Sequence, residues 1–201
     1  MAGDAYMVAV QSGALDGLDL DDKKIRRNLA RAINATSRRA RTAAAREIRQ
    51  QVNLPARYVS GKDGRLQQTK VASESDLSAI ITGRHRPTSL ARFAKNARKS
   101  GQTGARVEVS PGSARFLPKA FFIRLRSGAD GSNNNLGIAI RLPAGQKPSR
   151  AYKPKKMGEN LWLLYGPSID QVFDDVAEDL APESADFLGQ EFLRLTDLDL
   201  A

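Results

Sequence analysis

The chain has 201 residues, with 32 Lys and Arg against 22 Asp and Glu, which gives a net charge of +10. The absence of cysteine excludes a disulfide framework and thiolate metal sites, and it is typical of a reducing cytoplasm. There is no run of about 18 apolar residues, so we expect no membrane-spanning segment. The first residues lack the basic start of a signal peptide, so we expect none.

Charge is distributed unevenly along the chain. Residues 1–22 contain five acids and no Lys or Arg, whereas residues 23–50 contain ten Lys and Arg and one acid. Residues 51–167 contain 21 basic and six acidic residues, and residues 168–201 contain ten acids and one base. A basic middle between acidic ends indicates either nucleic-acid binding or self-association, in which acidic ends of one copy contact basic faces of the next.

The first half of the chain is predicted to begin with an arm and continue as helices. Residues 1–20 form the N-terminal arm, in which Tyr6–Val10 has the pattern of a β-strand, added either to the domain's own sheet or to a neighbouring subunit. Residues 21–52 repeat apolar side chains at the helical period after a run of acids that favours a helix N-terminus. Pro55 predicts a second, short helix that ends near Ser60.

The polar surface of the long helix is mostly arginine. Arginine binds phosphate and carboxylate equally well, so this surface is either solvated or faces DNA or an acidic partner. The candidate residues are Arg26, Arg27, Arg31, Arg38, Arg39 and Arg41.

The middle of the chain is predicted to be mainly β-structure. Residues 66–82 and 106–110 have β-prone sequences, and residues 95–106 read as a loop. The segment 116–128 is expected to begin as a turn or short helix and to continue as a strand, which a glycine- and asparagine-rich loop at 127–135 joins to a strand from Leu136. This pair of strands predicts an antiparallel hairpin.

The segment from Leu161 to Leu180 is predicted to organise the core as a buried strand, a Gly-Pro turn and an amphipathic helix. Ser168 is a suitable N-cap for that helix, and Pro182 is expected to break or kink it. Beyond Pro182, residues 182–201 form an acidic helical extension with a tail. The core motif consists of Leu161, Trp162, Leu163, Tyr165, Gly166, Pro167 and Phe173.

Recognisable site chemistry is missing from the sequence. There is no phosphate-binding glycine loop, no zinc-protease motif and no serine-hydrolase motif. His85 is the only histidine, and we expect it to be non-catalytic; Asp170, Asp174 and Asp175 are interpreted as the solvated face of a helix. The sequence therefore predicts no catalytic, cofactor-binding or metal-binding residues.

The segment LYGPSIDQVF, together with KAFFIRLRSG and the order of the remaining elements, resembles the prophage minor tail protein Z family of lambdoid phages. The resemblance implies a non-enzymatic virion protein that completes the head-proximal end of the tail and takes part in head–tail joining. It implies a homo-oligomeric ring, expected to be a hexamer. Its partners would be tail terminator, tail tube or head–tail connector proteins and DNA in the lumen, with no membrane.

We therefore expect an α+β fold in which a long N-terminal helix and a C-terminal helix pack on a mostly antiparallel sheet of four to five strands. The predicted division is an arm at 1–20, a domain at 21–181 and the extension at 182–201. The alternative function is a basic nucleic-acid-binding protein of phage or prophage origin. The acids expected to contact arginines of the same chain or of an adjacent one are Asp174, Asp175, Glu178, Asp179 and Glu183.

Overall fold

The computed structural model describes residues 22–95, 103–125 and 136–200. Two long helices are present, α1 (Lys23–Gln51) and α3 (Ile169–Leu200), with a short helix α2 (Ala56–Ser60). Strands β1 (Leu66–Lys70) and β2 (Ile80–Gly83) form a two-stranded sheet. The five-stranded sheet has the order β3-β4-β5-β7-β6, and its strands are β3 (Thr103–Glu108), β4 (Ala114–Arg124), β5 (Leu136–Arg141), β6 (Lys155–Lys156) and β7 (Leu161–Leu164).

Every strand pairing in the described part of the chain is antiparallel. This confirms the predicted α+β class, with a long helix near each end and an antiparallel sheet of five strands. The hairpin predicted from the segments on either side of residues 127–135 is β4–β5, in which Phe122 faces Ile138. The predicted loop at 127–135 and the predicted arm at 1–20 lie outside the described residues. The loop predicted at 95–106 is wrong over residues 103–106, because these belong to strand β3 and pair with β4.

The chain divides into two compact units. The helical unit comprises Met1–Ile48, Ala56–His85 and Asp170–Ala201, and the sheet unit comprises Arg49–Pro55 and Arg86–Ile169. Both long helices thus belong almost entirely to the unit that holds β1 and β2. The five-stranded sheet belongs to the other unit.

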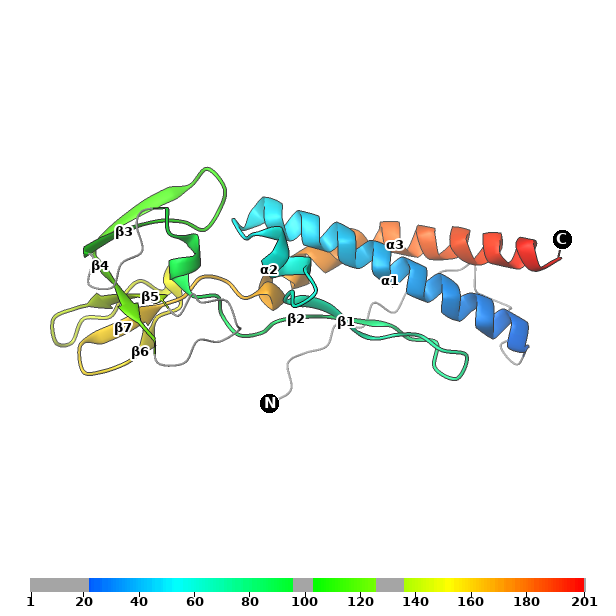
Figure 1. The fold of residues 1–201 in the computed structure, drawn as a ribbon, viewed down its shortest axis with the longest axis horizontal. Coiled ribbons are helices and arrows are strands. Elements are labelled where there is room, and N and C mark those ends of the chain that lie inside the picture. Colours follow the sequence, from blue (N-terminus) through cyan, green and yellow to red (C-terminus); the bar gives the residue numbers. More distant parts are fainter. Residues whose placement is uncertain (1–21, 96–102, 126–135, 201) are drawn as a thin grey trace. The chain divides into compact units, whose positions relative to one another are not determined.

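In the helical unit, α1 and α3 run antiparallel and side by side (Figure 1). Their shared core contains Leu29 and Ala32 from α1 and Leu188, Phe192 and Leu195 from α3. These positions follow the helical period, which explains why each helix has one apolar face. Apolar burial on that face stabilises the pair, because each buried large side chain contributes about 1.5–3 kcal/mol.

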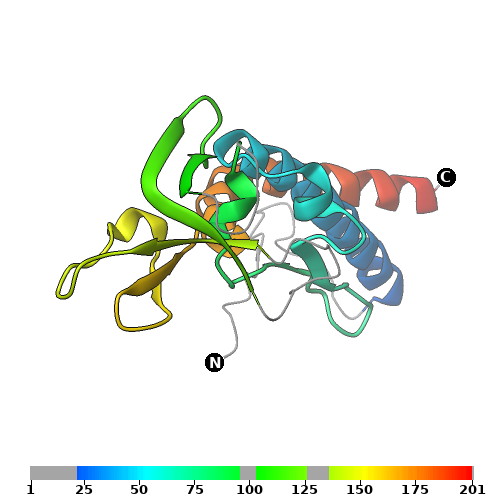
Figure 2. The same cartoon turned by 60° about the vertical axis from the view of Figure 1, so that its left-hand side comes forward.

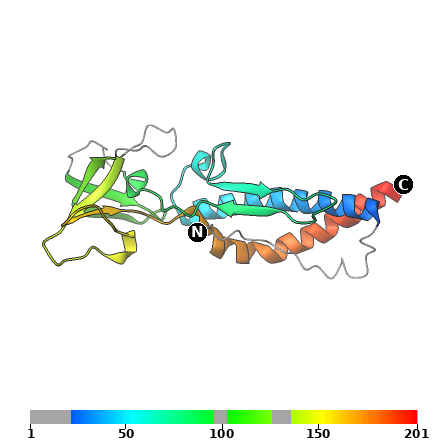
Figure 3. The same cartoon turned by 90° about the horizontal axis from the view of Figure 1, so that it is seen from below.

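The β1–β2 hairpin extends along α1, as Figure 3 shows from below. One side chain joins the two elements at two points: Asn34 donates to the carbonyl oxygen of Ala72 and accepts from its amide, both at 2.8 Å. Ile81 is buried in this unit as well. The hairpin is therefore held on α1 by backbone-directed hydrogen bonds as well as by apolar contact.

Helix α3 continues through Pro182 without a break. The sequence predicted a break or a kink there, and the break is wrong, although a proline inside a helix removes one backbone hydrogen bond and crowds the preceding turn. The residues on each side explain the continuity, since Val176 before the proline and Leu188 after it are both buried. Packing on both sides of Pro182 holds the chain helical, while the proline ring itself is exposed.

Candidate interface: the charged helix pair

The start of α1 is fixed by Asp22, as the acidic run in the sequence predicted. Its carboxylate oxygen Oδ1 accepts from the amides of Lys24 at 2.6 Å and Ile25 at 3.2 Å. These amides have no partner inside the helix, so a side-chain oxygen satisfies them. Because the cap fixes the residue at which α1 begins, it helps to determine where the arginines lie around the helix.

The arginines of α1 make more contacts within the chain than the sequence indicated. Arg27 pairs with Glu74 of the β1–β2 loop at 3.0 Å, and Arg26 donates to the carbonyl oxygen of the same residue. Arg41 donates to the carbonyl oxygen of Ser60 at 3.2 Å. Arg31 and Arg38 are exposed. The proposed role of these six arginines toward a partner stays a prediction.

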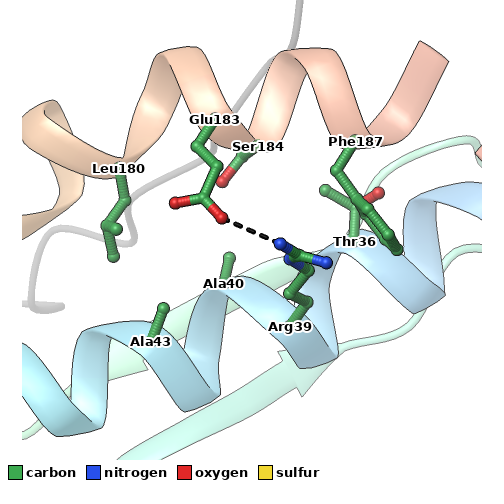
Figure 4. A pocket seen from close by; sticks show the side chains of 8 residues that line it. All are labelled: Thr36, Arg39, Ala40, Ala43, Leu180, Glu183, Ser184 and Phe187. Atoms are coloured by element: carbon green, nitrogen blue, oxygen red, sulfur yellow. Dashed lines mark hydrogen bonds and ion pairs between the residues drawn. The ribbon is translucent and has the colours of Figure 1, made fainter. Parts of the chain in front are cut away.

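The contact between α1 and α3 includes one ion pair, drawn in Figure 4. Arg39 Nη2 lies 2.9 Å from Glu183 Oε1, and the guanidinium lies over the ring of Phe187, 4.5 Å from its centroid. Both charged side chains are more than half exposed, at 56% and 62%. Exposed pairs of this kind contribute about 0–1 kcal/mol, so the pair positions the two helices more than it stabilises them.

The other acids of α3 differ in their surroundings. Asp175, Glu178 and Asp179 are exposed and form no ion pair with any described residue, whereas Asp174 is half-buried. Of the residues predicted to form the solvated face of a helix, Asp175 is exposed as predicted, whereas Asp174 is half-buried. Glu183 pairs with a candidate arginine of the same chain, Arg39.

Asp170 does not lie on a solvated face, contrary to the sequence prediction. Its side chain is only 9% exposed, and its Oδ2 lies 2.9 Å from Nδ1 of His85, whose side chain is 77% exposed. The amide of Asp170 also donates to the carbonyl oxygen of Arg84 at 3.3 Å. No sequence signal could have found this pair, because its members are 85 positions apart.

The Gly-Pro turn after β7 is built as the sequence predicted. The amide of Gly166 donates to the carbonyl oxygen of Thr88 at 2.8 Å, and the amide of Thr88 donates to that of Pro167 at 3.3 Å. A Cβ at Gly166 would lie 2.6 Å from Cε2 of Phe93, so no larger residue fits. Of the rest of the core motif, Leu163 and Phe173 are buried, and Leu161, Trp162 and Tyr165 are half-buried.

Three carboxylates have a lowered pKa, each because of a hydrogen-bond donor beside it. The amide of Gly112 and then the ammonium of Lys95 lower the pKa of Glu108. A hydrogen bond from Lys70 lowers the pKa of Asp76, and one from Arg194 lowers the pKa of Glu191. Asp76 is exposed, whereas Glu108 and Glu191 are half-buried. In each case the donor stabilises the ionised form of the carboxylate.

Two classes of site are missing from the part of the chain that the structure describes. No group of three or more His, Asp or Glu side chains is arranged to hold a metal ion among these residues. None of the described helices is long and apolar enough to cross a membrane.

The fold and its surface define an α+β protein whose most distinctive feature is an antiparallel helix pair of opposite charge. Comparison with protein-family models, with curated proteins and with solved structures found no match. Any functional conclusion therefore depends on the geometry, the charge distribution and the motif resemblance.

Proposed function

We propose that this chain is a structural virion protein that completes the head-proximal end of a phage tail and joins tail to head as a subunit of a homo-oligomeric ring. The resemblance of LYGPSIDQVF supports this proposal, and in the structure this segment forms the strand, turn and helix start expected of it. The protein would act in the virion after assembling in the host cytoplasm. It is not an enzyme in this proposal, so purified protein should show no turnover that depends on His85 or Asp170.

One observation supports the proposal above all others: only some of the oppositely charged side chains of α1 and α3 form ion pairs within the chain. Arg39 and Glu183 pair with each other, yet Asp175, Glu178 and Asp179 remain exposed on α3. Residues 86–169 add sixteen Lys and Arg against only three acids. Acids of one subunit can then contact bases of the next, which is the heterologous contact that closes a ring.

Charge reversal at Asp175, Glu178 and Asp179, each to Lys, tests the proposal. Single exposed pairs are weak, so three simultaneous reversals are needed to disrupt a network. We expect a folded subunit, by circular dichroism, that fails to join tails to heads in a complementation assay. Reversal of Arg38 to Glu in the same subunit, alone or with Arg31, should restore part of the titre.

The matched control reverses three dispersed exposed acids, Asp63, Glu159 and Asp186, to Lys. This variant has the same change in net charge but does not remove the cluster. A normal titre from the α3 variant would contradict the electrostatic account of assembly. A similar loss from both variants would show that net charge, not the α3 surface, is responsible.

The alternative is a nucleic-acid-binding protein, and the sheet unit supplies the observation that favours it. Its basic side chains are largely exposed, including Arg106, Lys119 and Arg141 and both residues of strand β6. A DNA binder that neutralises several phosphates loses affinity steeply as salt rises. Tight binding of duplex DNA at physiological salt, with such a slope and without effect from the α3 reversals, would favour this alternative.

A further inference from the structure

Strand β4 has two halves with different surroundings. Its second half, residues 120–124, pairs with β5, and Phe121 in that half also pairs with Thr103 of β3. Its first half, residues 114–119, pairs with β3 alone, and no described residue forms a backbone hydrogen bond to its other edge. Figure 2 shows β4 as a long, strongly curved strand. An unpaired edge of this kind is a template for another strand.

The exposure of β4 changes at the same position. Between Ala114 and Lys119 every side chain is exposed except Leu117, which is half-buried, whereas Ala120 and Phe122 are buried. Phe116 is 63% exposed, and the edge of its ring lies over Gly104, which has a positive φ of 80°. Phe116 thus places a large apolar side chain on the unpaired half of β4.

A cleft lies against one face of the β3–β4 hairpin within the sheet unit. Its volume is about 220 Å³, and its lining includes Val107, Arg115, Tyr152 and Gly166. Val107 and Arg115 are opposite each other in the β3–β4 ladder, so they lie on one face of the hairpin. Side chains of an added strand that pointed to this face would enter the cleft, and those that alternated with them would lie beside Phe116.

We propose that the occupant of this edge is the segment Tyr6–Val10 from the N-terminal arm of a second copy of this chain. These five residues are consecutively apolar, and the four residues of β4 before Pro118 offer a comparable length of edge. Pro118 ends that stretch because it has no amide hydrogen to donate. The contact is a β-strand addition, in which main-chain hydrogen bonds provide the affinity.

Charge and chain length agree with this occupant. Residues 1–22 carry five acids and no Lys or Arg, whereas the open half of β4 carries Arg115 and Lys119 and no acid. The twelve residues between Val10 and the first residue of α1 span about 40 Å when extended, which is enough to reach an adjacent subunit. The inference deepens the proposed function by naming a contact of the ring, and it depends on that function for the identity of the assembly.

Cysteine cross-linking between two populations of full-length chain tests this contact, because the native sequence has no cysteine. One population carries a single substitution in the arm: Tyr6→Cys, Met7→Cys, Val8→Cys, Ala9→Cys or Val10→Cys. The other carries Phe116→Cys. We expect disulfide-linked dimers with a period of two along the arm, because alternate side chains of a strand point to opposite faces.

The controls are Ala14→Cys in the arm and Val71→Cys in the helical unit, whose native side chain is 62% exposed. Equal cross-linking at all five arm positions, or with Val71→Cys, would overturn the proposal, as would no cross-linking at all. Cross-linking only when both cysteines are in one chain would also overturn it, because the occupant would then be the chain's own arm.

A second variant avoids any change in the described fold. Val8→Pro in the full-length chain should lower the sedimentation mass of the oligomer to that of smaller species, whereas Ala14→Pro should not. An unchanged mass for Val8→Pro would contradict the inference. Both measurements use purified protein, so they can succeed while head–tail joining fails, and the two proposals remain distinguishable.

Discussion

At the scale of single residues, a few close contacts leave no room for a larger side chain without strain. Gly166 is the clearest, because its amide bonds to Thr88 and its α-carbon lies against the ring of Phe93. A methyl group placed 2.6 Å from a buried ring carbon requires the ring or the turn to move. The turn that joins β7 to α3 therefore depends on glycine for close approach.

Gly166→Ala should lower the free energy of unfolding by about 1–3 kcal/mol, in line with overpacking of a buried site. Gly158→Ala is the matched control, because its nearest neighbouring atom would lie 3.9 Å from the new carbon. Urea denaturation of the two variants gives the comparison. Equal stability of Gly166→Ala and the native chain would contradict the described packing of Phe93.

Glu108 provides a prediction about pH. Its pKa is lowered from the ordinary 4.5 by the amide of Gly112 and by Lys95, so the folded state binds its proton less readily than the unfolded state does. The contribution of this carboxylate to stability is then fully present above the unfolded pKa and lost as pH falls through the lower folded value. Glu108→Gln should remove that contribution.

The expected result is a lower urea midpoint for Glu108→Gln at pH 7 and a difference from the native chain that shrinks below pH of about 4.5. Glu159→Gln, an exposed glutamate in the same unit, serves as the control and should follow the native chain at every pH. A difference for Glu108→Gln that persisted unchanged to pH of about 2 would show that the hydrogen bond does not depend on ionisation.

At the scale of elements, α3 is a helix with a proline, Pro182, in its interior. Pro182 lacks the amide that would bond to the residue four positions earlier, and its ring crowds the preceding turn. The helix nevertheless continues to Leu200, because apolar residues before and after the proline pack into the helical unit. Tertiary packing here outweighs a local preference of about 3 kcal/mol.

Pro182→Ala should therefore stabilise the chain, by about 1–3 kcal/mol, because alanine restores a hydrogen bond on an exposed position. Thermal unfolding followed at 222 nm would measure the effect. Pro143→Ala is the control, since Pro143 lies outside the helices and strands and its carbonyl accepts from Gln146. A destabilised Pro182→Ala variant would indicate that the proline shapes α3 for its contact with α1.

At the scale of the whole molecule, the two compact units have separate cores. Leu163 is buried in the sheet unit and Phe173 in the helical unit, although only ten positions separate them. Two residues that the sequence placed in a single core thus belong to different ones. Because of this division, we expect a destabilising substitution in one core to affect the unit that contains it.

Leu163→Asp should remove hydrogen-exchange protection from the sheet unit, and Phe173→Asp should remove it from the helical unit. An unpaired buried charge costs several kcal/mol, which is a large part of the total stability of a domain. Met157→Asp and Leu193→Asp are the controls, because those native side chains are 51% and 54% exposed. Retention of protected amides throughout Leu163→Asp would contradict the assignment of this strand to a core.

The sequence by itself determined the features that depend on neighbouring residues along the chain. The helical period of α1 and α3, the cap at Asp22 and the turn at Gly166–Pro167 are local, because backbone conformation and one-sided burial leave a periodic pattern. The two apolar segments on either side of the glycine- and asparagine-rich loop likewise predicted the hairpin of β4 and β5. These features were enough for the fold class.

Only the tertiary structure decided which distant residues meet. Three contacts join positions that share no sequence pattern. Asp170 is buried beside His85, Arg39 pairs with Glu183, and Asn34 is hydrogen-bonded to the backbone of Ala72. The continuity of α3 and the separation of the two cores arise in the same way. Packing free energy is summed over contacts between remote segments, and it can outweigh the local preference that a sequence displays.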